Sequence, residues 1–369
     1  MSSNKDLGPP NIGSLKCETW WRKHQPFLDN SGYRLRPKFD PSWRPPWQTN
    51  HEMYKSEERA LHSSPYIMDA MRVQDGKKVM LKRVSKSEFP LEVELSVFLS
   101  SSPLSEDPCN HCVPIHDVLQ SPRDSDYHIL VMPRLHKFHS PSFDTVGELV
   151  ECFRQILEGV ELLHRHFIAP RDLTLLNVIL DGSQLYPKGF HPAKTWANES
   201  YTGWAKHTTR TECWARYFVI DFGMTRRYVP PEIPYEPVSR CGNRYVPLGN
   251  MYFYVRTHRP LQFLVPLVDD MVQKGPSLRP TINEVVHSFA ILCNSLTKYH
   301  LRKPSNPRAN PVFQRARQLR HIATLLPPLP ISKFPVFPVA GDQHLRPVYT
   351  LIPGEAQLDK KQESLETTD

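Results

Sequence analysis

The sequence predicts an α+β protein in which a small, strand-rich unit is followed by a larger, mainly helical unit. Three observations predict this arrangement. Apolar runs flank the turn sequence Asp75-Gly76, apolar residues recur at helical spacing between residues 146 and 166, and the 37 prolines concentrate at the two ends of the chain. Because proline removes a backbone donor and fixes φ, we expect both ends to lack regular structure. The length of 369 residues fits one large domain or two smaller ones.

The composition is typical of a globular protein with a sizeable core: hydrophobic residues make up 39% and charged residues 23%. The net charge of +8 is not arranged as a stripe of Lys and Arg with interleaved aromatics, so we expect no nucleic-acid partner. No apolar run approaches the roughly 18 residues of a membrane helix, so we expect no membrane association. Seven scattered cysteines and the lack of a secretory signal in residues 1–10 predict a reducing compartment, the cytoplasm or the nucleus.

Residues 1–50 and 302–369 are the two proline-rich ends. The first is rich in Pro, Trp and Arg, as in the run from Pro41 to Trp47, and predicts an extended arm that packs its tryptophans on the fold. The alternative is a recruitment motif for a proline-binding module. The second end is Pro-rich, then basic, then acidic, and predicts a disordered tail.

We expect residues 51–133 to form the strand-rich unit. Two apolar runs, Ile67 to Val73 and Val79 to Val84, flank an Asp-Gly turn, which is typical of a β-hairpin. The sequence then predicts one helix and two more strands, at residues 91–99, 112–119 and 128–132.

We expect residues 134–301 to form the mainly helical unit. Apolar residues from Val146 to His166 lie on one face of an amphipathic helix. Two polar motifs follow, and a loop rich in Gly, Pro and aromatic residues, 183–216, joins them. Later helices are expected at Leu261 to Gln273 and at Thr281 to Thr297.

The two polar motifs, Pro170 to Asn177 and Val219 to Gly223, carry the residues for phosphoryl transfer. Asp172 can accept the proton of an attacking hydroxyl, and Asn177 and Asp221 can hold Mg²⁺ against the phosphates of a nucleotide. Each motif alone is a weak signal, because short motifs recur by chance. Their order, each beside a strand-like apolar run, makes the combination specific.

From about Tyr66 to Thr297 the chain resembles the protein kinase superfamily. The resemblance implies a bilobal protein-kinase-like fold, with a small β-rich N-lobe at 51–133 and a larger, mainly helical C-lobe at 134–301. It implies that Asp172, preceded by Arg171, is the catalytic base. Asn177 and Asp221 match the metal ligands of that family, and ATP and Mg²⁺ are the implied cofactors.

The resemblance also implies an ATP site in the N-lobe. Lys82 in the run Val79-Met80-Leu81-Lys82 matches the lysine that pairs with the α- and β-phosphates. A buried ammonium there needs an anionic partner on the next helix; Glu92 keeps the helical register best and Glu94 is second. The segment from Met132 to Leu135 resembles the hinge whose backbone meets adenine.

Three runs narrow the resemblance: Leu185 to Pro192, Thr208 to Thr211, and Arg216 to Asp221. Together they resemble a kinase-like family that is expanded in mushroom-forming (basidiomycete) fungi. That family carries an insertion, here 183–216, between the catalytic loop and the metal-binding Asp.

The sequence departs from the kinase pattern at several positions. No glycine occurs from Glu57 to Asp69, where a glycine-rich loop would cover the phosphates. Met80, Pro170 and Thr174 replace a small residue, a histidine and a lysine of the family. Compared with the family, the activation segment is shortened near Val246-Pro247-Leu248 and lacks a Glu, an Asp and the substrate-docking loop, through either a deletion in the protein or an error in the gene model. A further cluster, Cys109-Asn110-His111-Cys112 with His116, lacks the second ligand pair of a zinc site, so we expect Cys112 to pack inward.

Two hypotheses for function remain open. The first is a protein kinase-like phosphotransferase that moves the γ-phosphate of ATP to a protein hydroxyl, of Ser or Thr rather than Tyr. The second is a catalytically impaired pseudokinase that acts as a binding or scaffold protein. The five retained residues favour the enzyme, and the departures favour the scaffold. The identity of the protein substrate or partner does not follow from the sequence.

Overall fold

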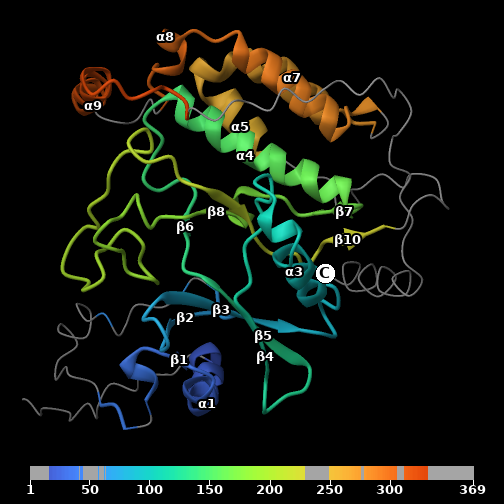
Figure 1. Cartoon of the computed structure of the whole chain (residues 1–369), viewed down its shortest axis with the longest axis vertical. Coiled ribbons are helices and arrows are strands. Elements are labelled where there is room, and N and C mark those ends of the chain that lie inside the picture. Colours follow the sequence, from blue (N-terminus) through green and yellow to red (C-terminus); the bar gives the residue numbers. More distant parts are fainter. Residues whose placement is uncertain are drawn as a thin grey trace, which may run out of the picture. The chain divides into compact units, whose positions relative to one another are not determined.

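The computed structural model describes residues 16–40, 42–44, 57, 62, 64–228, 249–275, 278–305 and 311–330. The protein is mixed α+β, with antiparallel sheets and helices (Figure 1). Its backbone divides into two compact units. Unit 1 comprises residues 1–93, 113–136 and 181–208, and unit 2 comprises residues 94–112, 137–180 and 209–369.

Unit 1 is built on a five-stranded sheet of order β1-β2-β3-β5-β4, in which all neighbouring strands are antiparallel. The predicted hairpin is confirmed, and Gly76 takes the left-handed φ of +68° that its turn requires. The strands are β1 (Tyr33–Arg34), β2 (Ile67–Arg72), β3 (Lys78–Ser85), β4 (Asp117–Gln120) and β5 (Tyr127–Pro133).

Helix α1 (Lys16–Asn30) corrects the prediction that residues 1–50 lack regular structure. Pro26 inside the helix opposes helix formation by about 3 kcal/mol. Trp21 and Leu28 are fully buried in α1, and each contributes roughly 1.5–3 kcal/mol of hydrophobic stabilisation, which offsets the proline. The predicted packing of tryptophan on the fold therefore holds for Trp21, but on a helix rather than an extended arm.

The core of unit 1 lies between α1 and one face of the sheet. Side chains alternate between the two faces of a strand, so Val79 and Leu81 of β3 point toward α1 and are fully buried. Met80 and Lys82 therefore point to the opposite face. The buried apolar cluster comprises Trp21, Leu28, Tyr33, Leu35, Phe39, Met68, Ala70, Val79, Leu81, Ile129 and Val131.

Unit 2 contains most of the helices. They are α3 (Glu92–Ser100, whose first two residues belong to unit 1), α4 (Val146–Arg165), α5 (Gly249–Thr257), α6 (Val265–Met271), α7 (Ile282–Asn294), α8 (Lys298–Leu301) and α9 (Pro311–Ala323). Short strands occur at β6 (His136–Lys137), β7 (Ile168–Ala169), β8 (Val178–Leu180), β9 (Tyr217–Val219) and β10 (Arg226–Arg227). Short 3₁₀ helices lie at Pro37–Phe39 in unit 1 and at Leu104–Glu106, Leu175–Asn177 and Arg259–Leu264 in unit 2.

The long helix α4 confirms the prediction for residues 146–166 and lies beside α7 (Figure 1). Thr145 caps its first turn, with the hydroxyl accepting a hydrogen bond from the backbone N–H of Glu148. Helix α7 begins with a capping box formed by Thr281 and Glu284, close to its predicted start. Nearly every residue of α4 is buried, including Glu148, Glu151, Gln155, Glu158 and Glu161.

Two predictions for the C-terminal half were wrong. Residues 261–273 do not form one helix: a 3₁₀ turn precedes α6, because Pro266 is compatible with the first turn of a helix but not with its interior. Residues 302–369 were predicted to be disordered, but Pro311–Ala323 within this range form helix α9. The shortened segment near Val246 to Leu248 lies outside the described residues.

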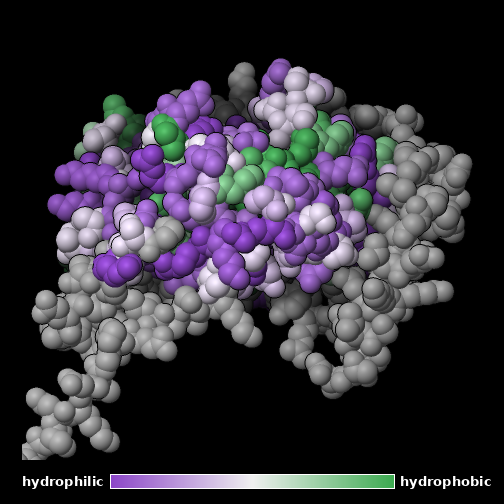
Figure 2. All heavy atoms as spheres, turned by 90° about the horizontal axis from the view of Figure 1, so that it is seen from below, coloured by the Kyte–Doolittle hydropathy of each residue, from purple (hydrophilic) through white to green (hydrophobic). Residues whose placement is uncertain are grey.

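The surface seen from the end where α1 and β4 lie in Figure 1 is mainly hydrophilic in its described part, with a few hydrophobic side chains between (Figure 2). Among the described residues, no helix is both long and apolar enough to cross a membrane.

Truncation of Trp21 tests the packing of α1. We expect Trp21→Ala to lower the free energy of unfolding by about 3–5 kcal/mol, because it leaves a cavity in the core of unit 1. Trp204, which is 77% exposed in the same unit, provides the matched control, and Trp204→Ala should change stability by less than about 0.5 kcal/mol. Urea unfolding followed by circular dichroism measures both; equal effects would show that α1 does not anchor the sheet.

Candidate functional site

Lys82 and Glu92 form a buried ion pair in unit 1. The Nζ of Lys82 contacts Oε1 of Glu92 from the sheet face opposite α1. The Glu92 side chain is only 3% exposed, so each charge depends on the other for stabilisation. The alternative partner, Glu94, is 63% exposed and lies near Arg227 instead. The structure thus forms the pair with Glu92, at the first residue of α3.

A second buried ionic cluster shares the face of the sheet that carries Lys82. Asp69 of β2 lies opposite Met80 of β3, and Met80 and Lys82 are two residues apart on one strand. The Oδ1 atom of Asp69 lies 2.6 Å from Nε2 of His62 and 3.2 Å from Nε of Arg36. Burial alone raises the pKa of Asp69, but the hydrogen bond from His62 and the charge of Arg36 outweigh it and lower this pKa to about 2.

A cavity of about 510 Å³ opens beside this cluster within unit 1. Its lining carries both signs of charge, from Arg36, Glu57, Asp69, Lys78, Arg134 and Glu199. Arg134 pairs with Glu199 at 2.7 Å, which neutralises both charges at that wall. Small-molecule sites are usually lined by apolar groups with a few polar ones, so this cavity differs from an adenine slot.

The segment expected to act as a hinge, Met132 to Leu135, begins within the last two residues of β5. Met132 is buried opposite Met80, Leu135 is half-buried, and the N–H of Arg134 donates to the carbonyl of Lys78 over 3.3 Å. His136, directly after it, stacks on Tyr186 from the loop 183–216. The first part of that loop therefore packs within unit 1.

The expected catalytic residues lie in unit 2 on the loop between β7 and β8. Arg171 and Asp172 are half-buried, and Leu173 anchors the loop in the core with 4% exposure. The side-chain amide of Asn177 donates to the backbone carbonyl of Asp172 over 2.8 Å and to its Oδ2 over 3.1 Å. Asn177 thus fixes the orientation of the Asp172 carboxylate.

Asp221 is brought beside Asn177 by strand pairing. Val178 of β8 lies opposite Val219 of β9, and the N–H of Ile220 donates to the carbonyl of Asn177 over 2.9 Å. The ladder therefore ends with Asn177 and Asp221 at the same edge. Asp221 is exposed and has a left-handed φ of +66°, a conformation that costs most residues about 1–2 kcal/mol and that is enriched at functional sites.

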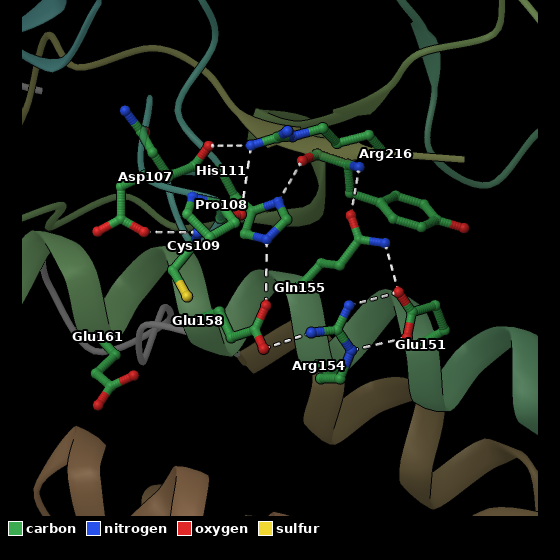
Figure 3. Close-up of polar contacts among 12 residues, drawn as sticks. Asp107, Pro108, Cys109, His111, Glu151, Arg154, Gln155, Glu158, Glu161 and Arg216 are labelled. Carbon is green, nitrogen blue, oxygen red and sulfur yellow. Dashed lines mark hydrogen bonds and ion pairs between the residues drawn. The ribbon is translucent and has the colours of Figure 1, made fainter. Parts of the chain in front are cut away.

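A network of buried polar side chains on α4 holds β9 in place (Figure 3). The side-chain oxygen of Gln155 accepts from the N–H of Tyr217 over 2.8 Å, and its nitrogen donates to Glu151 and to the carbonyl of Ala215. Arg154 forms ion pairs with both Glu151 and Glu158. β9 is thereby bonded to the helix through its backbone.

His111 also bonds the backbone of β9, at the same edge as Gln155 (Figure 3). Its Nδ1 lies 3.1 Å from the carbonyl of Tyr217, its Nε2 lies 3.3 Å from Glu158, and its own carbonyl accepts from the N–H of Val219. A Cβ on Gly159 would lie 2.9 Å from the Cβ of His111, so glycine permits this approach. Sequence reasoning missed this network; its only signal is polar residues at helical spacing within an apolar helix.

In the cysteine–histidine cluster, Cys112 packs inward. Cys112 is 5% exposed, as predicted, and burial raises the pKa of its thiol to about 12, which opposes formation of the thiolate that zinc binds. Within the described ranges, no three or more His, Cys, Asp or Glu side chains are placed to hold a metal ion.

Arg210 anchors the second part of the loop 183–216 in unit 2. It is 2% exposed and donates to the hydroxyl of Tyr217 and to the carbonyls of Phe138 and Pro141, over 2.6–2.7 Å. Next to it, Thr211 donates from its backbone and its hydroxyl to Glu148 of α4. These hydrogen bonds hold the part of the loop that directly precedes β9.

Comparisons with known proteins do not supply a family: no family model matches the chain, and no curated protein is similar to it. Function is therefore inferred from two sets of residues. One is the Lys82–Glu92 pair of unit 1, and the other is Asp172, Asn177 and Asp221 of unit 2.

The cluster around Asp69 makes stability depend on pH. Its pKa is lowered in the folded protein, so its contribution is complete above a pH of about 4 and is lost as the pH falls toward 2. We expect Asp69→Asn to destabilise the protein by on the order of 2 kcal/mol near neutral pH. Urea unfolding measures this effect. The difference in the free energy of unfolding between wild type and Asp69→Asn should narrow as the pH falls from about 5 to about 2.5. A constant gap would contradict the assignment.

Proposed function

We propose that the protein is an ATP-dependent phosphotransferase of the protein kinase type, which moves the γ-phosphate of ATP to a Ser or Thr hydroxyl of a protein. The observation that carries this proposal is the geometry in unit 2. The amide of Asn177 orients Asp172, and the β8–β9 ladder sets Asn177 beside Asp221. A base and two oxygen ligands in this order are what phosphoryl transfer uses.

Each residue has a role that its surroundings support. Asp172 accepts the proton of the attacking hydroxyl, with Asn177 holding its carboxylate in one orientation. Because the amide nitrogen of Asn177 is directed to Asp172, its oxygen remains as the atom that can bind a cation. A carboxylate and an amide oxygen suit Mg²⁺, which takes its remaining ligands from phosphates and water. Mg²⁺ supplies charge neutralisation at the transferred phosphate.

Unit 1 supports the proposal through Lys82. In a bilobal protein-kinase-like fold, unit 1 corresponds to the N-lobe and Lys82 pairs with the α- and β-phosphates while Glu92 positions it. The strand β5 and the segment Met132–Leu135 would then meet adenine. The proposal places the protein in the cytoplasm or nucleus, with a protein substrate whose identity the residues do not specify.

A second candidate function is that of a scaffold with impaired catalysis, and unit 1 carries the observation that favours it. The connection from β1 to β2, residues 35–66, contains no glycine. Instead, Arg36 and His62 from this connection pair with Asp69 on the sheet face that carries Lys82. Charged groups at this position would compete with a nucleotide for the face.

Asp172→Asn separates turnover from folding. We expect it to reduce phosphorylation of generic protein substrates by roughly 10²–10⁴-fold, because the proton acceptor is lost. Stabilisation by Mg·ATP in a thermal-shift assay should be retained. Asp270→Asn, an exposed change in α6 of the same unit, is the matched control and should behave as wild type. Turnover unchanged in Asp172→Asn would show that the base is wrongly assigned.

Glu92→Gln and Glu94→Gln test the nucleotide contact in unit 1. Glu92→Gln leaves the Lys82 ammonium partly buried without its counter-charge and should lower stability by roughly 3–5 kcal/mol. We also expect it to remove most of the increase in Tm that Mg·ATP produces, whereas Glu94→Gln should keep both. The increment with ATP is the measurement, because each variant is compared with its own Tm without ATP. Lack of any increment in wild type would overturn ATP binding; an increment without turnover would favour the scaffold.

A further inference from the structure

Helix α9 packs on unit 2 through its polar side. Gln314 and His321 are buried, with 6% and 1% exposure. The Nη1 of Arg317 donates to both carboxylate oxygens of Asp144 over 2.9 and 3.0 Å, and Gln318 donates to the carbonyl of Arg302 over 2.7 Å. Hydrogen bonds rather than apolar contacts therefore hold these side chains of α9 to unit 2.

The apolar side of α9 faces outward. Most amphipathic helices bury this side, so its exposure is unusual. The large apolar residues exposed on α9 and just after it are Val312 at 70%, Phe313 at 66%, Leu319 at 68%, Ile322 at 51% and Leu325 at 89%. Large apolar side chains exposed together on one helix are typical of an interaction site.

The spacing of the outward residues matches a helical partner. Val312, Ala316, Leu319 and Ala323 are exposed and succeed one another at intervals of four, three and four residues. This spacing places them in one stripe along the helix, as at the a and d positions of a coiled coil. The two alanines allow a second helix to approach closely.

The charges that flank the stripe decide what kind of helix fits. Helix α9 contains no acidic residue, and successive residues turn by about 100°, which places Arg315 on one side of the stripe and Arg320 on the other. Both side chains are exposed, and Arg320 also contacts Glu212 over 2.7 Å. A second copy of α9 would bring arginines near arginines, which is unfavourable.

We propose that the outward face of α9 binds an amphipathic helix of a partner protein whose apolar stripe is flanked by Asp or Glu. Apolar burial along the stripe supplies affinity, and pairing with Arg315 and Arg320 selects acidic helices over basic ones. The site is separate from the residues proposed for phosphotransfer, so its existence does not depend on that activity.

Two synthetic helical peptides test this proposal with the full-length protein. Both are about 21 residues long with leucine at a and d; one has glutamate at e and g and the other lysine. In fluorescence anisotropy we expect the glutamate peptide to bind at least about tenfold more tightly than the lysine peptide. Its affinity should fall when salt is raised from about 50 to about 300 mM, because exposed charges are screened.

Leu319→Glu and Leu278→Glu are the matched variants, because these leucines are 68% and 69% exposed in the same unit. Leu319→Glu should weaken binding of the glutamate peptide at least about tenfold, and Leu278→Glu should leave it unchanged. Arg315→Glu should reverse the preference toward the lysine peptide. Circular dichroism confirms that each variant remains folded.

Three results would overturn the proposal. The first is equal binding of the two peptides, and the second is an equal loss of binding in Leu319→Glu and Leu278→Glu. The third is a wild-type dimer in sedimentation that Leu319→Glu converts to monomer, which would assign the face to a second copy of the chain.

Discussion

The burial of α4 is the constraint on which the structure of unit 2 depends. A polar group that loses water must find a partner within the protein, and α4 carries Glu148, Glu151, Gln155 and Glu158 inside the core. Their partners come from segments distant in sequence, including His111, Thr211 and the backbone of β9. The hydrogen bonds that the buried polar side chains of α4 require therefore fix the course of several loops.

The position of Asp221 follows from that constraint. Gln155 and His111 bond one edge of β9, and β9 pairs through its other edge with β8 up to the carbonyl of Asn177. Asp221 follows this ladder and adopts a left-handed conformation, and Phe222 is buried directly after it. The β8–β9 ladder thus leads into an exposed carboxylate with a left-handed backbone, a conformation that suits the metal-binding role proposed for Asp221.

The errors of sequence-based prediction have a common physical cause. The sequence of α1 contains a proline and several charged residues, so it did not predict a helix. Trp21 and Leu28 stabilise this helix through contacts with strands far along the chain. In α9, the apolar pattern was present but faces outward, with the polar side packed on Asp144 and Arg302. Local propensity describes what a segment prefers alone, and tertiary contacts of a few kcal/mol can override it.

The sequence by itself determined the hairpin, helices α3, α4 and α7, the partner of Lys82, and the set formed by Asp172, Asn177 and Asp221. These features depend on short-range periodicity, turn residues and motif spacing, which one chain displays directly. Only the tertiary structure decided that Arg36 and His62 occupy the sheet face beside Lys82, and that Gln155, Glu158 and His111 hold β9. Most of those contacts join residues tens of positions apart, and no local pattern encodes which buried polar groups will satisfy one another.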